Sequence, residues 1–192
     1  MKKKLQLTLC CLIVTMATFA QANSHLKFMG IPITGTIAQF QTKLIAKGCT
    51  YDKETSAIAD PGIRIFKGTF IGNKVRICVF YDIKTKIVYR TKAIVDGVSE
   101  DVAEQEYYKT KNLLSQKYGS EDEDMAIGTK DGKESVSFIS ADDEGIINGS
   151  IDLFITQDET TWIRAPHNYN LHIDYNDRIN TSKHIDQQLD EI

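Results

Sequence analysis

Apolar residues first recur at helical spacing between residues 37 and 47. Thr36 and Gln39 form a capping box at the start of this segment, and Gly48 stands where a C-terminal cap belongs. The apolar stripe consists of Ile37, Phe40 and Leu44. This pattern predicts a helix over residues 37–47.

Two further segments have helical spacing. One begins after Ser99, carries acidic residues in its first turn and ends at Gly119. The other covers about residues 182–192 at the end of the chain. The expected apolar stripes are Ala103, Tyr107, Leu114 and Tyr118 in the first, and Ile185, Leu189 and Ile192 in the second.

Short runs rich in β-branched and aromatic residues lie between these helices. Gly72-Asn73 separates two of them and indicates a hairpin, while Asn148-Gly149-Ser150 indicates a bulge or a turn. Residues 75–81 are apolar on both faces, which is typical of a central strand. The expected strands are about 63–71, 75–81, 86–95, 134–140, 146–156, 160–165 and 169–175.

The order of elements is a helix followed by strands, twice over. This order predicts the α+β class, with antiparallel sheets and helices packed on one face. Residues 36–96 and 99–175 would be two similar halves. The alternative is a single sheet without a true repeat.

The first residues have the pattern of a secretory signal. Three lysines precede an apolar stretch over residues 5–19, and Ala20-Gln21-Ala22 is a cleavage pattern. We expect residues 1–22 to be a signal peptide and residues 23–192 to be one mature domain, periplasmic or secreted, without an integral membrane segment. The alternative is an uncleaved anchor.

Charge limits the class of partner. The whole chain has a formal net charge of −3, and the leader holds three lysines and no acidic residue, so the mature chain carries −6. An acidic chain of this kind is a poor candidate for binding nucleic acid.

Two cysteines, Cys49 and Cys78, remain in the mature chain. Export makes a disulfide between them possible. The alternative is two separate buried thiols that pack as small apolar side chains.

Common catalytic and cofactor motifs are absent from the sequence, including G-x-S-x-G, H-E-x-x-H and both glycine-rich phosphate loops. The sequence therefore indicates no cofactor, no metal and no catalytic residue. His172 and Asp174 share one face of a strand and could form an acid–base pair. Because Leu171, Ile173 and Tyr175 alternate with them, the better interpretation places both on the solvent side.

Two acidic segments begin like calcium-binding loops. Asp122-x-Asp124 and Asp174-x-Asn176 have the first ligands, but isoleucine stands at the required glycine and neither segment has the final glutamate. Both are better explained as solvated polar positions, with a weak, irregular calcium site as the alternative.

The binding candidates are a basic stripe and two aromatic residues. Lys84, Lys86, Arg90 and Lys92 would share a face of one strand and could hold an anionic ligand or an acidic partner. The favoured alternative is a lysine-rich strand that prevents edge-to-edge pairing. Trp162 and Tyr169 flank a turn and could bind a sugar or a protein, or could pin the turn to the core.

The run KFMGIPITGTIAQFQTKLIAKG over residues 27–48 resembles the start of small exported proteins of unknown function from gut anaerobes. In those proteins an aromatic residue often follows the Lys-Gly, where this chain has Cys49. The doubled order of elements is also similar to the plan of the β-lactamase inhibitor proteins, which are binders. Neither resemblance implies an activity or a functional residue.

We therefore expect an exported, non-enzymatic binding or protein-interaction module, whose partner is a protein or a small anionic or glycan ligand. The alternative is a small periplasmic hydrolase with a dispersed active site. A concave sheet face without clustered ionisable groups would favour the binding module. A deep pocket that holds His172 or His167 beside an acid and a Ser or Cys would favour the hydrolase.

Overall fold

The computed structural model describes residues 24–119, 125–157 and 168–190. The predicted signal peptide, the acidic pair Asp122 and Asp124, and the expected strand at 160–165 lie outside these ranges. The helices are α2 (Ile37–Ala46), α3 (Lys53–Ile58), α4 (Glu100–Tyr118) and α5 (Arg178–Leu189). The strands are β1 (Lys27–Phe28), β2 (Ile31–Pro32), β3 (Thr50–Tyr51), β4 (Ile63–Phe70), β5 (Asn73–Tyr81), β6 (Val88–Val98), β7 (Met125–Lys130), β8 (Lys133–Ala141), β9 (Ile147–Gln157) and β10 (Tyr169–Asp177).

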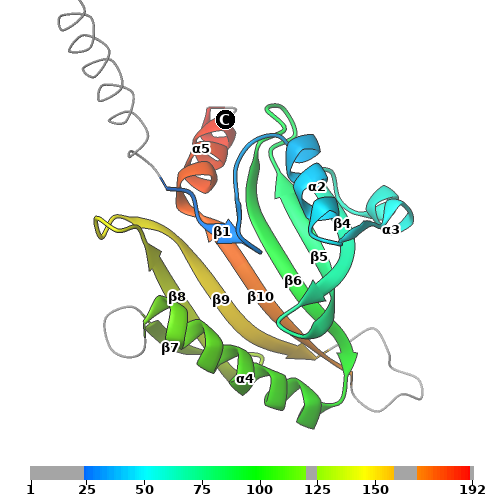
Figure 1. The fold of residues 1–192 in the computed structure, drawn as a ribbon, viewed down its shortest axis with the longest axis vertical. Coiled ribbons are helices and arrows are strands. Elements are labelled where there is room, and N and C mark those ends of the chain that lie inside the picture. Colours follow the sequence, from blue (N-terminus) through cyan, green and yellow to red (C-terminus); the bar gives the residue numbers. More distant parts are fainter. Residues whose placement is uncertain (1–23, 120–124, 158–167, 191–192) are drawn as a thin grey trace, which may run out of the picture.

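One antiparallel sheet dominates the fold. Its strand order is β3-β4-β5-β6-β10-β9-β8-β7, while β1 and β2 pair separately. The last strand of the first half, β6, therefore lies beside the last strand of the second half, β10, at the centre of the sheet (Figure 1). The predicted α+β class is confirmed, and each half contributes four neighbouring strands.

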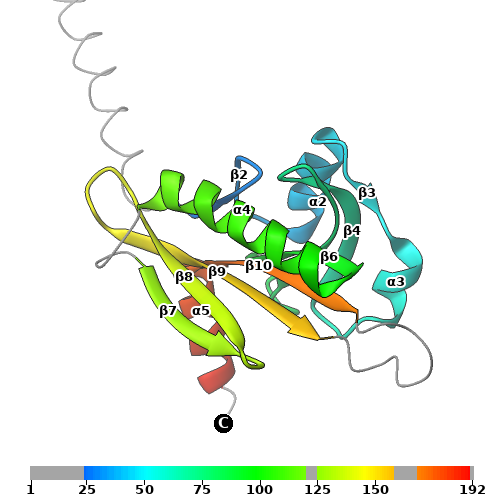
Figure 2. The same ribbon diagram turned by 90° about the horizontal axis from the view of Figure 1, so that it is seen from below.

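The core lies between this sheet and two helices. Figure 2 shows α2 and α4 on one side of the sheet. The first helix forms as predicted, because Thr36 and Gln39 make the capping box and its three apolar residues are buried. The largest fully buried side chains include Tyr107, Phe28, Phe40, Phe66 and Phe138.

Several elements differ from the sequence-based expectation. Neither α3 nor β7 was expected, and α5 begins several residues earlier than the expected helix because Asp177 caps it. Two residues of the predicted stripe are solvent-exposed, Ile185 at 48% and Leu189 at 58%, and the third, Ile192, lies outside the described residues. Instead α5 lies on the side of the sheet away from α4 (Figure 2), in contact with β6, β9 and β10.

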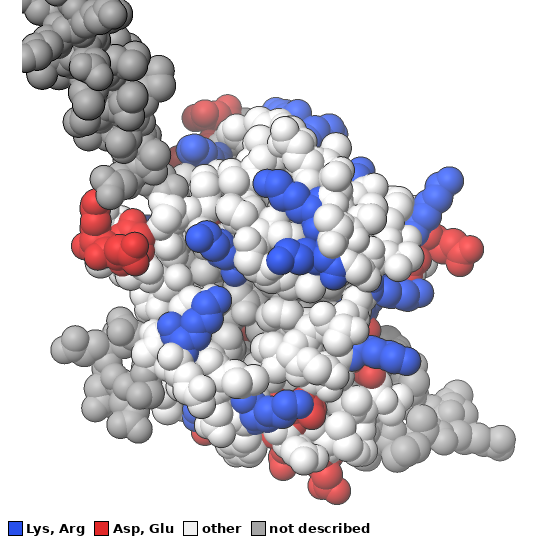
Figure 3. Space-filling view, in the orientation of Figure 1, with Lys and Arg blue, Asp and Glu red and all other residues white. Residues whose placement is uncertain are grey.

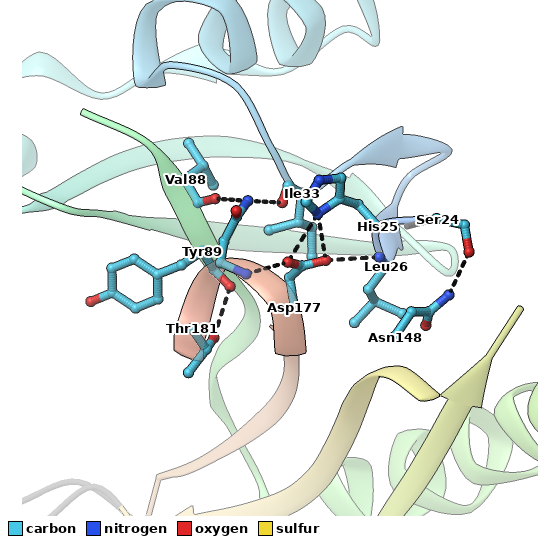
Figure 4. A network of polar contacts seen from close by, with 10 residues as sticks. Ser24, His25, Leu26, Ile33, Val88, Tyr89, Asn148, Asp177 and Thr181 are labelled. Atoms are coloured by element: carbon cyan, nitrogen blue, oxygen red, sulfur yellow. Dashed lines mark hydrogen bonds and ion pairs between the residues drawn. The ribbon is translucent and has the colours of Figure 1, made fainter. Parts of the chain in front are cut away.

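A buried carboxylate joins this helix to the rest of the fold. Asp177 is fully buried and accepts hydrogen bonds from the backbone N–H groups of Leu26 and Asn180, both at 2.9 Å (Figure 4). Its Oδ1 also lies 3.0 Å from Nδ1 of His25. The amide of Asn180 in turn donates to two backbone carbonyls of other segments. These belong to Ile33 and Val88, each 3.0 Å from Nδ2.

The predicted irregularity in β9 is a bulge. The pairing of β8 with β9 shifts between Ser140 and Ala141, opposite Gly149 and Ile147, so Asn148 is the extra residue. Gly149 then lies directly against β10 and the segment that precedes β1. A Cβ atom at this position would come closer than 3.0 Å to the backbone oxygen of Asn176 and to within 2.9 Å of Leu26.

The two cysteines do not form a disulfide. Both are free and buried. Cys49 belongs to the core beneath α2 and α4, whereas Cys78 belongs to a small cluster with Ile65 and Ile94 on the other face of the sheet. Because the sheet separates the two thiols, the alternative of separate buried cysteines is correct. Burial raises the pKa of both thiols.

Among the residues that the structure describes, no helix has both the length and the apolar character needed to cross a bilayer.

Candidate functional site

The face of the sheet turned away from α2 and α4 carries a group of charged and aromatic side chains. We call this surface the open face. It receives alternate residues of three neighbouring strands, because side chains alternate between the two faces of a strand. The residues that define it are Arg90 and Lys92 on β6, Asp152, Phe154 and Thr156 on β9, and His172 and Asp174 on β10.

Asp174 is the centre of an ion-pair cluster on this face. The carboxylate is 2% exposed, and it accepts hydrogen bonds from Nε of Arg90 at 2.8 Å and from its Nη2. Lys92 Nζ lies 3.0 Å from the same carboxylate. The hydrogen bonds to Asp174 raise the pKa of Arg90. The cluster holds two cations and one anion in fixed positions across two central strands.

An aromatic stack lies beside this cluster. The rings of Phe154 and His172 are 4.7 Å apart and nearly parallel, with an angle of 10° between them. Two lysines approach the Phe154 ring, Lys130 at 3.7 Å and Lys92 at 5.5 Å from its centroid. Lys130 belongs to the edge strand β7, so the stack lies under a side chain from the border of the sheet.

His172 is held in its neutral form. Burial, followed by the charges of Lys92 and Lys130, lowers its pKa to about 4. Its Nε2 lies 2.8 Å from the hydroxyl of Thr156, while its buried Nδ1 has no partner within the described part of the chain. Asp174 therefore does not orient this imidazole.

A groove of about 260 Å³ opens between the ion-pair cluster and β8. One wall holds Asp152, which accepts hydrogen bonds from the hydroxyl of Ser137 and, at 2.9 Å, from the amide of Asn176. The lining residues are Arg90, Lys130, Ser135, Val136, Ser137, Asp152, Leu153, Phe154 and Asp174.

The structure does not bring the predicted basic stripe together. Lys84 and Lys86 lie in the turn between β5 and β6, and only Arg90 and Lys92 share a strand face. The register changes at this turn, where Lys86 has a positive φ of 62°. Arg90 and Lys92 are also paired with Asp174, so the four residues do not form an anion site.

The favoured alternative for the stripe, a lysine-rich strand that prevents edge-to-edge pairing, is also wrong. β6 pairs with both β5 and β10, so it is an interior strand and not an edge in need of protection. The cations on it neutralise a neighbouring carboxylate instead.

Tyr169 is not on the open face. It belongs to the core beneath α4, where Lys133 lies 5.2 Å from its ring centroid. Its place in the core favours the second of the two interpretations for this residue. Trp162 lies outside the described residues.

The predicted pair of His172 and Asp174 does share one face away from the main core, as expected. Neighbouring side chains nevertheless bury Asp174. The same carboxylate was a possible calcium ligand, but its contacts are with Arg90 and Lys92. Two adjacent cations disfavour a metal ion there.

Several residues of the open face were missed at the sequence level. Asp152, Phe154 and Thr156 alternate with Ile151, Leu153 and Ile155, and this alternation is the signal that could have placed them on one face. Lys130 had no such signal, because its position over Phe154 depends on the pairing of β7 with β8 and of β8 with β9.

The pKa of His172 leads to a testable pH dependence. An imidazole with a folded pKa of about 4 and a usual value of 6.5 binds fewer protons when folded. We therefore expect its contribution to stability to be complete above about pH 6.5 and to be lost as the pH falls toward 4. The measurement is an NMR titration of the imidazole, together with the free energy of unfolding across this range. The His172→Gln variant should show a flatter dependence, and titration of His172 near 6.5 would contradict the burial argument.

Comparison of the chain with known proteins found no matching family, no matching curated protein and no matching solved structure.

Proposed function

We propose that this protein is an exported binding module that holds its ligand on the open face of the sheet. The leader pattern in residues 1–22 supports export. The observation that carries the proposal is the groove between the ion-pair cluster and β8, which Phe154 also lines. Its polar groups are fixed by mutual contacts before any ligand arrives, which lowers the entropic cost of recognition.

The charges around the groove favour an anionic group on the ligand. The cations Arg90 and Lys92 are matched to Asp174, and Asp152 is bound by Ser137 and Asn176. Lys130 is different, because its contact in the described structure is with the Phe154 ring and not with a carboxylate. A ligand anion would supply the missing counter-charge. This role belongs to Lys130 and not to the stripe predicted from the sequence.

The way the ionisable side chains of the open face are paired favours binding over hydrolysis. Such groups do cluster on this face, but the carboxylate of Asp174 is committed to two cations. The hydroxyl next to His172 is that of Thr156, and no acid contacts the other ring nitrogen within the described residues. A hydroxyl nucleophile normally needs a base that is itself oriented by a third group.

The test is titration of the protein with phosphate, citrate and glutamate, followed by NMR. We expect at least one of these probes to shift the resonances of Phe154 and His172. Lys130→Ala should weaken that binding about tenfold, since a hydrogen bond to a charged group contributes roughly 1.5–3 kcal/mol.

Lys74→Ala is the matched control, because Lys74 is an exposed lysine on β5 outside the groove. Shifts confined to other parts of the molecule, or equal weakening by both substitutions, would contradict the proposal. Turnover of an ester that disappears in both Thr156→Val and His172→Gln would establish the hydrolase instead.

A further inference from the structure

A second surface, on the opposite side of the sheet, carries exposed lysines. It is formed by β1, by one flank of α2 and by the C-terminal half of α4. We call it the lysine face. Its members are Lys27, Lys43, Lys47, Lys109 and Lys117. Figure 3, which looks onto α2 and α4, shows basic side chains across this surface and acidic ones mainly at its borders.

The segment that supplies three of these lysines contains no acid. Residues 24–51 form β1, β2, α2 and β3, and they include Lys27, Lys43 and Lys47 but neither Asp nor Glu. The whole chain has a net charge of −3, so positive charge is concentrated here against the overall balance. Lys43, in the last turn of α2, and Lys47, at its C-cap, are also four residues apart, a spacing at which like charges repel slightly.

Contacts distinguish these three lysines from those that are matched to carboxylates in the described structure. Among the matched lysines, Lys67 lies 2.8 Å from Asp52 and Lys111 lies 2.8 Å from Glu134. Lys27, Lys43 and Lys47 are exposed and have no carboxylate partner within the described ranges. Lys43, in the last turn of α2, and Lys47, at its C-cap, suit the helix dipole, but no carboxylate in the described ranges neutralises the three charges, which are available to a partner.

The three lysines lie close enough to act together. A Cβ atom at Gly30, in the turn between β1 and β2, would lie 3.9 Å from Nζ of Lys47. Lys27, on the strand that leads into this turn, and Lys117 line one cavity of about 390 Å³. The lysine face thus runs from α2 across the turn to the end of α4.

The lining of that cavity also includes acidic residues, which argues for a partner that places its negative charges at separate points. The acidic residues are Asp142, Asp143 and Glu144 from the turn between β8 and β9. A flat anionic bilayer lying across the lysine face would also meet these carboxylates and be repelled. An acidic segment of a protein can place its carboxylates over the lysines alone.

We propose that the lysine face docks an acidic surface of a partner protein. The partner would present several carboxylates to Lys27, Lys43 and Lys47. Such a contact chiefly increases the rate of association and weakens as salt screens the charges. This docking is independent of ligand binding on the open face, because the two surfaces lie on opposite sides of the sheet (Figure 2).

The experiment measures binding of a synthetic ten-residue glutamate peptide and of vesicles that contain phosphatidylglycerol. One variant combines Lys27→Glu, Lys43→Glu and Lys47→Glu. The control combines Lys53→Glu, Lys74→Glu and Lys183→Glu, which changes the net charge equally at exposed lysines elsewhere. Thermal melts establish that both variants fold.

We expect the peptide to bind the unmodified protein with an affinity that falls as salt rises. The first variant should weaken binding about tenfold or more, and the control should change it less than about threefold. Equal losses in both variants, or no binding of the peptide at low salt, would overturn the proposal. Vesicle binding that is tighter than peptide binding and is lost in the first variant would assign the face to a membrane instead.

Discussion

The Gly149→Ala variant is expected to lose roughly 2–4 kcal/mol of unfolding free energy, the range of a severe overpacking substitution. The added methyl group would come closer than 3.0 Å to the backbone oxygen of Asn176 and to within 2.9 Å of Leu26. The oxygen belongs to the adjacent central strand and cannot move aside as a flexible side chain could. The measurement is chemical denaturation followed by circular dichroism.

Gly128→Ala is the matched control for this substitution. Gly128 lies on the edge strand β7, and a Cβ atom there would lie 3.3 Å from the hydroxyl of Ser135. A serine side chain can rotate away, so the change in stability should stay within about 1 kcal/mol. A Gly149→Ala protein as stable as this control would show that β9 and β10 are not held at the spacing described.

The Asp177→Ala variant is expected to lose about 3–5 kcal/mol, comparable to breaking a buried charged contact. Removing the carboxylate leaves the backbone N–H groups of Leu26 and Asn180 without an acceptor in a buried site. The N-cap of α5 is lost at the same time. Hydrogen exchange provides a local readout, because these two amides should lose protection first.

Asp177→Asn tests the role of charge and acceptor number. The asparagine amide keeps the size of the carboxylate but has only one acceptor oxygen. One of the backbone N–H groups of Leu26 and Asn180 would therefore face the NH2 group of the asparagine, which is itself a donor. We expect a loss smaller than that of the alanine variant. Asp186→Ala, at an exposed position of α5, should have little effect. If Asp177→Ala were as stable as Asp186→Ala, the connection between the N-terminal segment and α5 would be unimportant.

Local sequence patterns predicted the elements that are set by interactions between residues only a few positions apart. The capping box of Thr36 and Gln39 placed the first helix, because both partners of each hydrogen bond are three residues apart. Gly72-Asn73 indicated the hairpin of β4 and β5, although the turn residues are Ile71 and Gly72, both with positive φ. The apolar positions on both faces of residues 75–81 correctly indicated an interior strand.

Predictions failed where the deciding partner was distant in the sequence. Ile185 and Leu189 of the expected apolar stripe are exposed, because polar contacts of Asp177 and Asn180 attach the last helix to segments near the N-terminus and to β6. Tyr169 is buried because α4 covers it, not because of its neighbours in the chain.

By itself, the sequence determined the α+β class, the doubled order of helix and strands, an irregularity at Asn148-Gly149-Ser150 and the pattern of a leader. Each of these follows from spacing or from turn and cap residues that interact locally. Only the tertiary structure decided which charges are paired, which thiols are separated and which lysines remain available. Those outcomes depend on strand order and on register, since pairing β6 with β10 is what brings Arg90 and Lys92 to Asp174 across the centre of the sheet.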